Sequence, residues 1–146
     1  MLSANEILKN INYFGNNEDG SIRLIVKNTS GERLERGKAV YVSSLNENKD
    51  VQVLPTQPNN NNTILCAGLL SETVENNEFC EIVSYGDFFN ISTSGYSLND
   101  KLYADPTSLG GLTNIMSSES SMQSIVGYVK VVSEENGVII VDSPLR

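Results

Sequence analysis

Short apolar runs alternate with turn-forming residues along most of this sequence, and this alternation limits the possible folds more than any other feature. It is clearest between Cys66 and Val132, where Gly, Asn, Asp or Ser interrupts each run after a few residues. Such spacing is typical of all-β proteins. We predict a small antiparallel β-barrel or sandwich of about nine short strands. The predicted strands are residues 22–27, 39–43, 51–54, 63–70, 79–84, 88–92, 101–104, 125–133 and 138–142.

Two turn signals refine this prediction. Asn136-Gly137 separates the apolar runs 129–133 and 138–141, and Asn-Gly is a strong hairpin signal because both residues tolerate positive φ. We therefore predict a closing β-hairpin. Residues 36–42 and 99–104 echo each other, since each has a tight turn, a lysine and then a strand carrying a tyrosine. Turn chemistry alone can produce this echo, so it does not establish a duplication.

The N-terminal segment differs from the rest of the chain. Ser3 and Glu6 form a capping-box pattern, apolar residues then recur at helical spacing, and Gly15 provides a stop. We predict a short amphipathic helix over residues 3–14 and then a polar linker, within residues 1–20, followed by a β-domain over residues 21–146. A helix of about three turns is marginal alone, so its apolar face must dock on its own domain or on another chain. The residues predicted to make this contact are Ile7, Leu8, Ile11 and Phe14.

The charge and the absence of histidine exclude several function classes. With 10 Lys and Arg against 18 Asp and Glu, the net charge is -8, so the average field repels nucleic acid. The chain has no histidine, which removes the commonest general base and metal ligand. Residues 31–39 lack the spacing of a phosphate-binding loop, and Ala39 stands where Ser or Thr should hold magnesium. We predict no catalytic, cofactor-binding or metal site, no cofactor, and no enzymatic activity.

The two cysteines and the N-terminus bear on location. Cys66 and Cys80 lie in apolar runs, where free cysteines act as small core residues, and a disulfide is the alternative if their strands pair. Residues 1–10 lack the apolar core of a signal peptide, and no run approaches the ~20 apolar residues of a membrane span. We expect a protein that stays in the cytosol after synthesis and has no membrane partner.

Aromatic residues are concentrated between residues 85 and 103. Aromatic rings can stack on the apolar faces of sugars, while neighbouring Asn and Asp side chains bond the hydroxyl groups. One interpretation is therefore a glycan platform formed by Tyr85, Phe88, Phe89 and Tyr96. The other interpretation is that these rings alternate within strands and belong to the core.

The order of strands and turns resembles that of a known family. Each matching segment is ordinary strand or turn chemistry, and the likeness lies in their succession over about two-thirds of the chain. The segments are residues 34–42, 67–70, 77–86, 98–104 with 110–113, and 125–129 with 137–141. Together they resemble the small β-domains of tailed-bacteriophage capsid decoration (cement) and head-fibre proteins. Asn77 and Asn99 stand where glycine is typical in that family, and asparagine can occupy the left-handed backbone that such positions need.

The resemblance implies a non-enzymatic structural protein of the virion. It would assemble in the host cytoplasm, bind the major capsid protein or another virion protein on the exterior of the capsid as a homotrimer, and stabilise the shell or carry a head fibre. Two other functions remain open. One is a tail-fibre or receptor-binding module that binds host surface glycans, and the other is a small trimeric nucleotidase, which no phosphate-binding motif supports.

Overall fold

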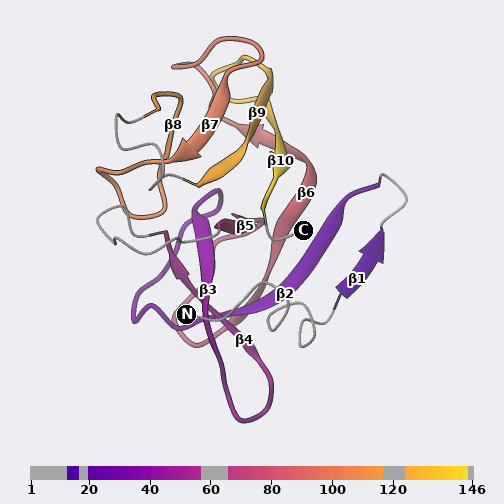
Figure 1. Ribbon diagram of the computed structural model, residues 1–146, viewed down its shortest axis with the longest axis vertical. Coiled ribbons are helices and arrows are strands. Elements are labelled where there is room, and N and C mark those ends of the chain that lie inside the picture. The colour runs from indigo at the N-terminus through magenta and orange to yellow at the C-terminus, as the bar shows by residue number, and fades with distance from the viewer. Residues whose placement is uncertain (1–12, 17–19, 57–65, 117–123, 145–146) are drawn as a thin grey trace.

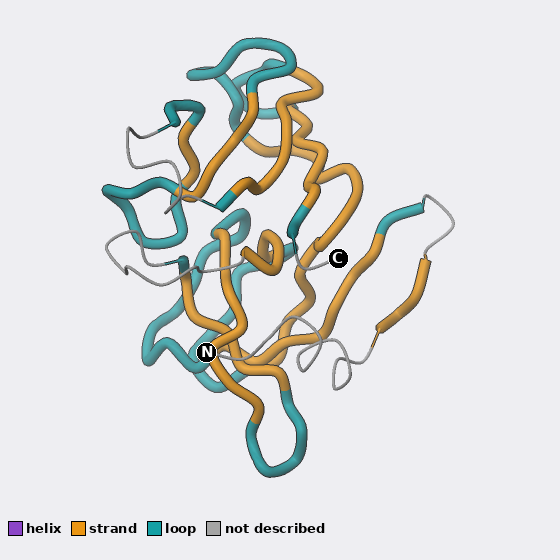
Figure 2. The backbone as a smooth tube through the Cα atoms, viewed as in Figure 1, coloured by secondary structure: helices purple, strands orange, loops and turns teal. Residues whose placement is uncertain are grey.

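The computed structural model describes residues 13–16, 20–56, 66–116 and 124–144, with side chains from residue 20 onward. Every regular element in these residues is a strand (Figures 1 and 2). The predicted all-β class is therefore confirmed. The strands are β1 (Tyr13–Asn16), β2 (Ile22–Asn28), β3 (Ala39–Leu45), β4 (Val51–Pro55), β5 (Cys66–Leu70), β6 (Phe79–Ile91), β7 (Lys101–Ala104), β8 (Leu112–Thr113), β9 (Ile125–Val131) and β10 (Gly137–Asp142).

Five strands close into a barrel. They pair in the order β2-β4-β3-β5-β6, and β6 pairs in turn with β2. The β2–β4 pair is parallel, while the other four pairs of the ring are antiparallel. Because the ring is closed, each of the five strands has a pairing partner on both sides, which protects the barrel from edge-to-edge association. Of the two predicted architectures, the structure contains the barrel. The prediction that it is antiparallel throughout is wrong at the parallel β2–β4 pair, where β4 closes the ring beside β2.

Strand β6 extends beyond the barrel and starts a second part of the sheet. Its first half pairs with β2, and its second half pairs with β10 from Tyr85 to Ile91. The sheet continues in the order β10-β9-β7-β8 (Figure 1). The sequence predicted two strands here, residues 79–84 and 88–92, because Tyr85-Gly86-Asp87 has the composition of a turn. Gly86 instead lies within the strand at φ 118°, and a Cβ there would lie 2.7 Å from the Cβ of Ser21.

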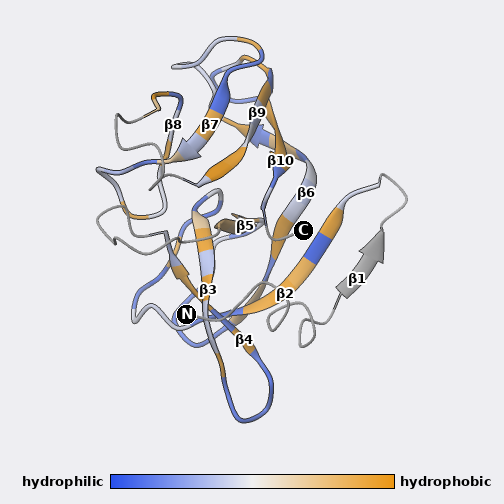
Figure 3. Ribbon diagram, in the orientation of Figure 1, coloured by the Kyte–Doolittle hydropathy of each residue, from blue (hydrophilic) through white to orange (hydrophobic). Residues whose placement is uncertain are grey.

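Two apolar clusters lie on opposite faces of the barrel wall. One fills the barrel and includes Leu24, Val26 and Ile82, so buried and more exposed residues alternate from Leu24 onward along β2, a mostly hydrophobic strand (Figure 3). The other lies between the wall and the second part of the sheet, and includes Leu69 and Ile139. All five residues of β5 are buried because this strand separates the two clusters. The apolar runs of this fold are short because each strand crosses a small core.

The β2–β3 and β5–β6 loops cross and bind each other symmetrically. Leu34 and Val74 form an antiparallel bridge in which each backbone nitrogen donates to the other's carbonyl at 2.9 Å. The flanking backbone bonds repeat with the same symmetry. They run from Gly37 N to Leu70 O, from Leu70 N to Lys38 O, from Asn77 N to Asn28 O and from Asn28 N to Glu78 O. The barrel thus contains two strand–loop–strand units related by an internal pseudo-twofold, which the sequence analysis did not detect.

The two units and the start of β7 share one turn. Gly37, Asn77 and Asn99 each lie two residues before a strand, with φ values of 90°, 67° and 70°. The expectation that Asn77 and Asn99 adopt left-handed backbone is confirmed. The shared turn also accounts for the echo between residues 36–42 and 99–104.

The predicted closing hairpin forms, but its turn is longer than predicted. Strands β9 and β10 pair antiparallel, and residues 132–136 connect them. Thr93 shapes this connection, because its Oγ1 donates to Val131 O at 2.8 Å and accepts from Ser133 N at 2.9 Å. Gly137 has a different role from the one predicted. A Cβ there would lie 2.3 Å from Thr93 Oγ1 and 2.4 Å from Ile91 O, so close packing against β6 requires glycine.

The N-terminal helix prediction lies mostly outside the described residues, which exclude residues 1–12 and 17–19. Its last two residues, Tyr13 and Phe14, belong to β1, which pairs antiparallel with β2. Sheet pairing with β2 satisfies the backbone there, so those two positions correct the predicted helix end. Cys66 and Cys80 are free thiols in different clusters, which is the core-packing role predicted for them.

Candidate functional site

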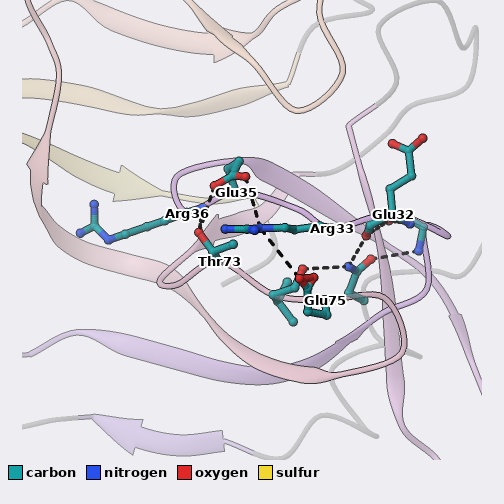
Figure 4. Close-up of polar contacts among 9 residues, drawn as sticks. Glu32, Arg33, Glu35, Arg36, Thr73 and Glu75 are labelled. Atoms are coloured by element: carbon teal, nitrogen blue, oxygen red, sulfur yellow. Dashed lines mark hydrogen bonds and ion pairs between the residues drawn. The ribbon is translucent and has the colours of Figure 1, made fainter.

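The crossing of the two loops carries a network of charged and polar side chains (Figure 4). Arg33 lies between Glu35 and Glu75, with its Nε 3.4 Å from one carboxylate and 3.9 Å from the other. The Arg33 side chain is 60% exposed, so water screens these ion pairs and they contribute little. Thr73 connects the loops more directly, since its Oγ1 accepts from Arg36 N at 3.1 Å and donates to Glu35 at 3.2 Å. The Thr73 bonds and the Leu34–Val74 backbone bridge therefore hold the loops together, and the Arg33 ion pairs add little.

Arg36 joins the loop crossing to the second half of β6. Its guanidinium donates to the carbonyls of Phe89 at 2.6 Å, Asn90 at 3.1 Å and Ser71 at 3.2 Å. The same group lies 4.4 Å from the centre of the Phe88 ring. A planar, five-donor fork suits such a stacked and hydrogen-bonded position better than a lysine ammonium. Arg36 thus covers one edge of the second cluster and fixes β6 relative to the barrel.

The four predicted glycan-platform residues separate into two pairs. Tyr85 and Phe89 are 37% and 49% exposed and lie on the same outer face of β6. Phe88 is buried in the second cluster because neighbouring residues of a strand face opposite sides. Tyr96 packs against the same cluster and donates from its hydroxyl to Leu112 O at 3.2 Å. Burial, and secondarily the negative charge of Asp105, raise the pKa of Tyr96.

Tyr85 and Phe89 border a surface depression of about 240 Å³, which we call the aromatic depression. Asp87 lies between them on β6, and its carboxylate accepts from Lys130 Nζ at 2.9 Å across β10. The complete lining is Gly20, Tyr85, Gly86, Asp87, Phe89 and Ile140. The site therefore has two half-exposed rings, an oriented ion pair and an apolar floor at Ile140. Beyond Tyr85, the segment of β6 that carries Asp87 and Phe89 pairs with β10.

A second depression lies across β10 from the first. It measures about 390 Å³ and is lined by Ile125, Tyr128, Asp142, Ser143 and Pro144. Asp142 pairs with Tyr85 in the β10–β6 register, and Ile140 pairs with Tyr128 in the β10–β9 register. The two depressions thus belong to one outer sheet face.

The free edge of the second sheet part carries exposed apolar side chains. Strand β8 is the last strand of the sheet in the described residues. Leu98, Ile115 and Met116 are 61%, 71% and 56% exposed. Asn114 Nδ2 donates to Asp100 Oδ2 at 2.9 Å, which brings the turn carrying Leu98 next to the end of β8. We call β8 and these three residues the β8 edge.

The remaining predicted contact residues are only partly placed. Ile7, Leu8 and Ile11 lie outside the described residues, and Phe14 is described only as a backbone position of β1. Among the described residues, no group of His, Cys, Asp and Glu is placed to hold a metal ion. The same part of the chain contains no helix long and apolar enough to cross a membrane.

Sequence reasoning did not identify Asp87, Lys130, Ile140 or the β8 edge. A period-two pattern over residues 85–89 separates Phe88 from Tyr85 and Phe89, and it places Asp87 between the two outward rings. That signal was obscured by Gly86. The ion pair with Lys130 requires knowledge of the β6–β10–β9 order, which no local pattern contains.

Comparison with known protein families, with curated proteins and with solved structures finds no match to this chain.

Proposed function

We propose that this chain is a non-enzymatic structural protein of a tailed bacteriophage, which binds the exterior of the capsid as a decoration or head-fibre homotrimer. The resemblance in strand and turn order motivates this proposal. The observation that supports it best is the β8 edge, where three large apolar side chains are more than half exposed near β8, the last strand of the sheet in the described residues. Exposed apolar surface at a sheet edge favours contact with another chain.

The charge of the chain fits an exterior location. At a net charge of -8, the protein is repelled by packaged nucleic acid and is kept soluble on the outside of a particle. Capsid stabilisation would follow from linkage, because a protein that binds the assembled lattice and not its dissociated subunits stabilises the lattice. At a free concentration of about one hundred times Kd, each occupied site contributes about 2.7 kcal/mol.

The N-terminal segment is the second element proposed for assembly. Strand β1 lies outside the closed ring of strands, and the pairing of β2 with β6 does not depend on it. A chain that begins at Asp19 should therefore retain its β-sheet circular dichroism while losing trimer formation or capsid binding. Loss of the β-sheet signal instead would place the segment in the folding core and contradict an assembly role.

The test of the β8 edge uses purified heads that lack this protein. Adding the full chain should raise the temperature at which these heads disrupt, and light scattering of the bound and free protein should report a trimer. The double variant Ile115→Gln, Met116→Gln should weaken both effects. The control Ile25→Gln changes an exposed apolar residue on the barrel, far along the sheet from β8, and should retain them.

Three outcomes would contradict the proposal. If saturated heads disrupt at the temperature of bare heads, the stabilising role is wrong. If the double variant and the control behave alike while both remain folded, the β8 edge is not the contact surface. Hydrolysis of nucleotides, peptides or glycans by the purified chain would contradict the non-enzymatic assignment.

A further inference from the structure

The aromatic depression has features that the capsid role does not use. Two aromatic side chains four positions apart on one strand, Tyr85 and Phe89, lie on the same face. A carboxylate lies between them at Asp87, and the Lys130 ammonium fixes its position at 2.9 Å. We propose that this depression binds neutral or N-acetylated oligosaccharides. The proposal does not depend on the capsid role.

The chemistry of the lining favours a saccharide. The apolar face of a sugar ring packs on an exposed aromatic ring, and its hydroxyl groups both donate and accept hydrogen bonds. Asp87 supplies an acceptor and Lys130 supplies donors, while their mutual pairing limits the cost of desolvating either charge. A mixed pair of this kind suits hydroxyl groups, which need both donors and acceptors. An apolar peptide side chain would leave both charges without new partners.

The backbone of the site is already in place before any ligand arrives. Residues 85–91 of β6 pair with β10, and the first half of the strand pairs with β2. Gly86 also lines the depression, and its close approach to Ser21 leaves no room for a Cβ. Little backbone entropy is therefore lost on binding, which favours affinity.

The spacing and the charge narrow the ligand class further. Four residues of extended strand separate the Cα atoms of Tyr85 and Phe89 by about 13 Å. A monosaccharide covers one ring at a time, whereas an oligosaccharide can cover both rings. The net charge of -8 disfavours saccharides rich in carboxylates or sulfates. We therefore expect affinity to rise from monosaccharide to trisaccharide.

The experiment is a binding assay on the full chain with named probes. A printed array of neutral, N-acetylated and acidic oligosaccharides identifies the preferred series. Calorimetric titration then compares glucose with maltotriose and N-acetylglucosamine with triacetylchitotriose. The variants Tyr85→Ala and Phe89→Ala should each weaken binding by about tenfold, as expected for loss of a central aromatic contact. Phe89→Trp, with a larger ring, should retain or strengthen it.

The matched control is Phe79→Ala. Phe79 is on the same strand and is 53% exposed, close to the 49% of Phe89, but it lies on the barrel beside Lys27. Its variant should bind saccharides as the unmodified chain does. Absence of binding to every array member, binding only to acidic saccharides, or equal loss in all three alanine variants would each overturn the proposal.

Discussion

Replacement of Arg36 tests whether one side chain couples the barrel to the second part of the sheet. Arg36→Ala removes three hydrogen bonds to the carbonyls of Ser71, Phe89 and Asn90, and uncovers the ring of Phe88. Arg36→Lys retains a positive charge and loses the planar fork. Both changes leave the loop backbone able to keep its bridge between Leu34 and Val74.

The expected magnitude follows from these contacts. The three bonds are at the surface, where water can replace the lost donors, so the loss of each bond should lower the free energy of unfolding by about 0.5 kcal/mol. The stacked guanidinium adds about 0.5–1 kcal/mol at an exposed position. Arg36→Ala should therefore reduce the free energy of unfolding by about 2 kcal/mol, which corresponds to a Tm decrease of ~6 °C for a chain of this size. Arg36→Lys should reduce the free energy of unfolding by about half as much as Arg36→Ala.

The assay is urea unfolding followed by far-UV circular dichroism, with Arg33→Ala as the matched control. Arg33 is the same residue type in the same loop, but its contacts are two long and exposed ion pairs, so its removal should cost less than about 0.5 kcal/mol. A double-mutant cycle with Phe88→Leu separates the stacking contribution from the hydrogen bonds. Equal unfolding midpoints for Arg36→Ala and Arg33→Ala would refute the coupling role.

Three further predictions test the close packing, a turn and a buried thiol. Gly127→Ala should destabilise the fold severely, because its Cβ would lie 2.0 Å from Ile140 O, whereas Gly95→Ala has nothing within 4 Å and should change Tm little; thermal unfolding of the pair checks this. Asn99→Ala should cost about 1 kcal/mol because Asn99 has a φ of 70°, whereas Asn99→Gly should restore stability, as urea midpoints would report. Burial raises the pKa of the Cys66 thiol from 9.0 to about 12, so between these pH values the folded protein retains a proton that the unfolded chain releases. The protonated thiol therefore makes its whole contribution to the free energy of unfolding below pH 9. That contribution should fall as the pH rises toward 12, by up to about 1.4 kcal/mol per pH unit. If the free energy of unfolding of a Cys66→Ala variant fell equally steeply between pH 9 and 12, the prediction would be wrong.

Local patterns predicted the strands well where side-chain alternation and turn residues agreed. The alternating residues of β2 and the left-handed asparagines at Asn77 and Asn99 are examples. The prediction was wrong where a glycine had a packing role. Gly86 was interpreted as a turn and Gly137 as half of one, but each lies where a Cβ would collide with a neighbouring segment, at Ser21 and at Ile91 with Thr93. Composition cannot distinguish these roles because both require the absence of a Cβ.

The candidate sites were less predictable than the strands. The two residues of β8 are too few to show any periodicity, so the exposed Ile115 and Met116 had no predicted element to flank. The aromatic depression depends on β10 lying between β6 and β9. That neighbour order is set by tertiary packing, and a single sequence provides no signal for it.

Closure of the barrel through β2 and β6 also determines when the chain can fold. Arg23 and Glu81, which form an ion pair across this seam, are 58 positions apart in the sequence. Bringing such distant strands together costs loop entropy before the contacts form, so folding should be slow for a chain of this size. During synthesis, β2, β3 and β4 emerge with unpaired edges and remain aggregation-prone until β6 is available. A nascent chain that stops before Phe79 therefore has no strand with which to complete the barrel.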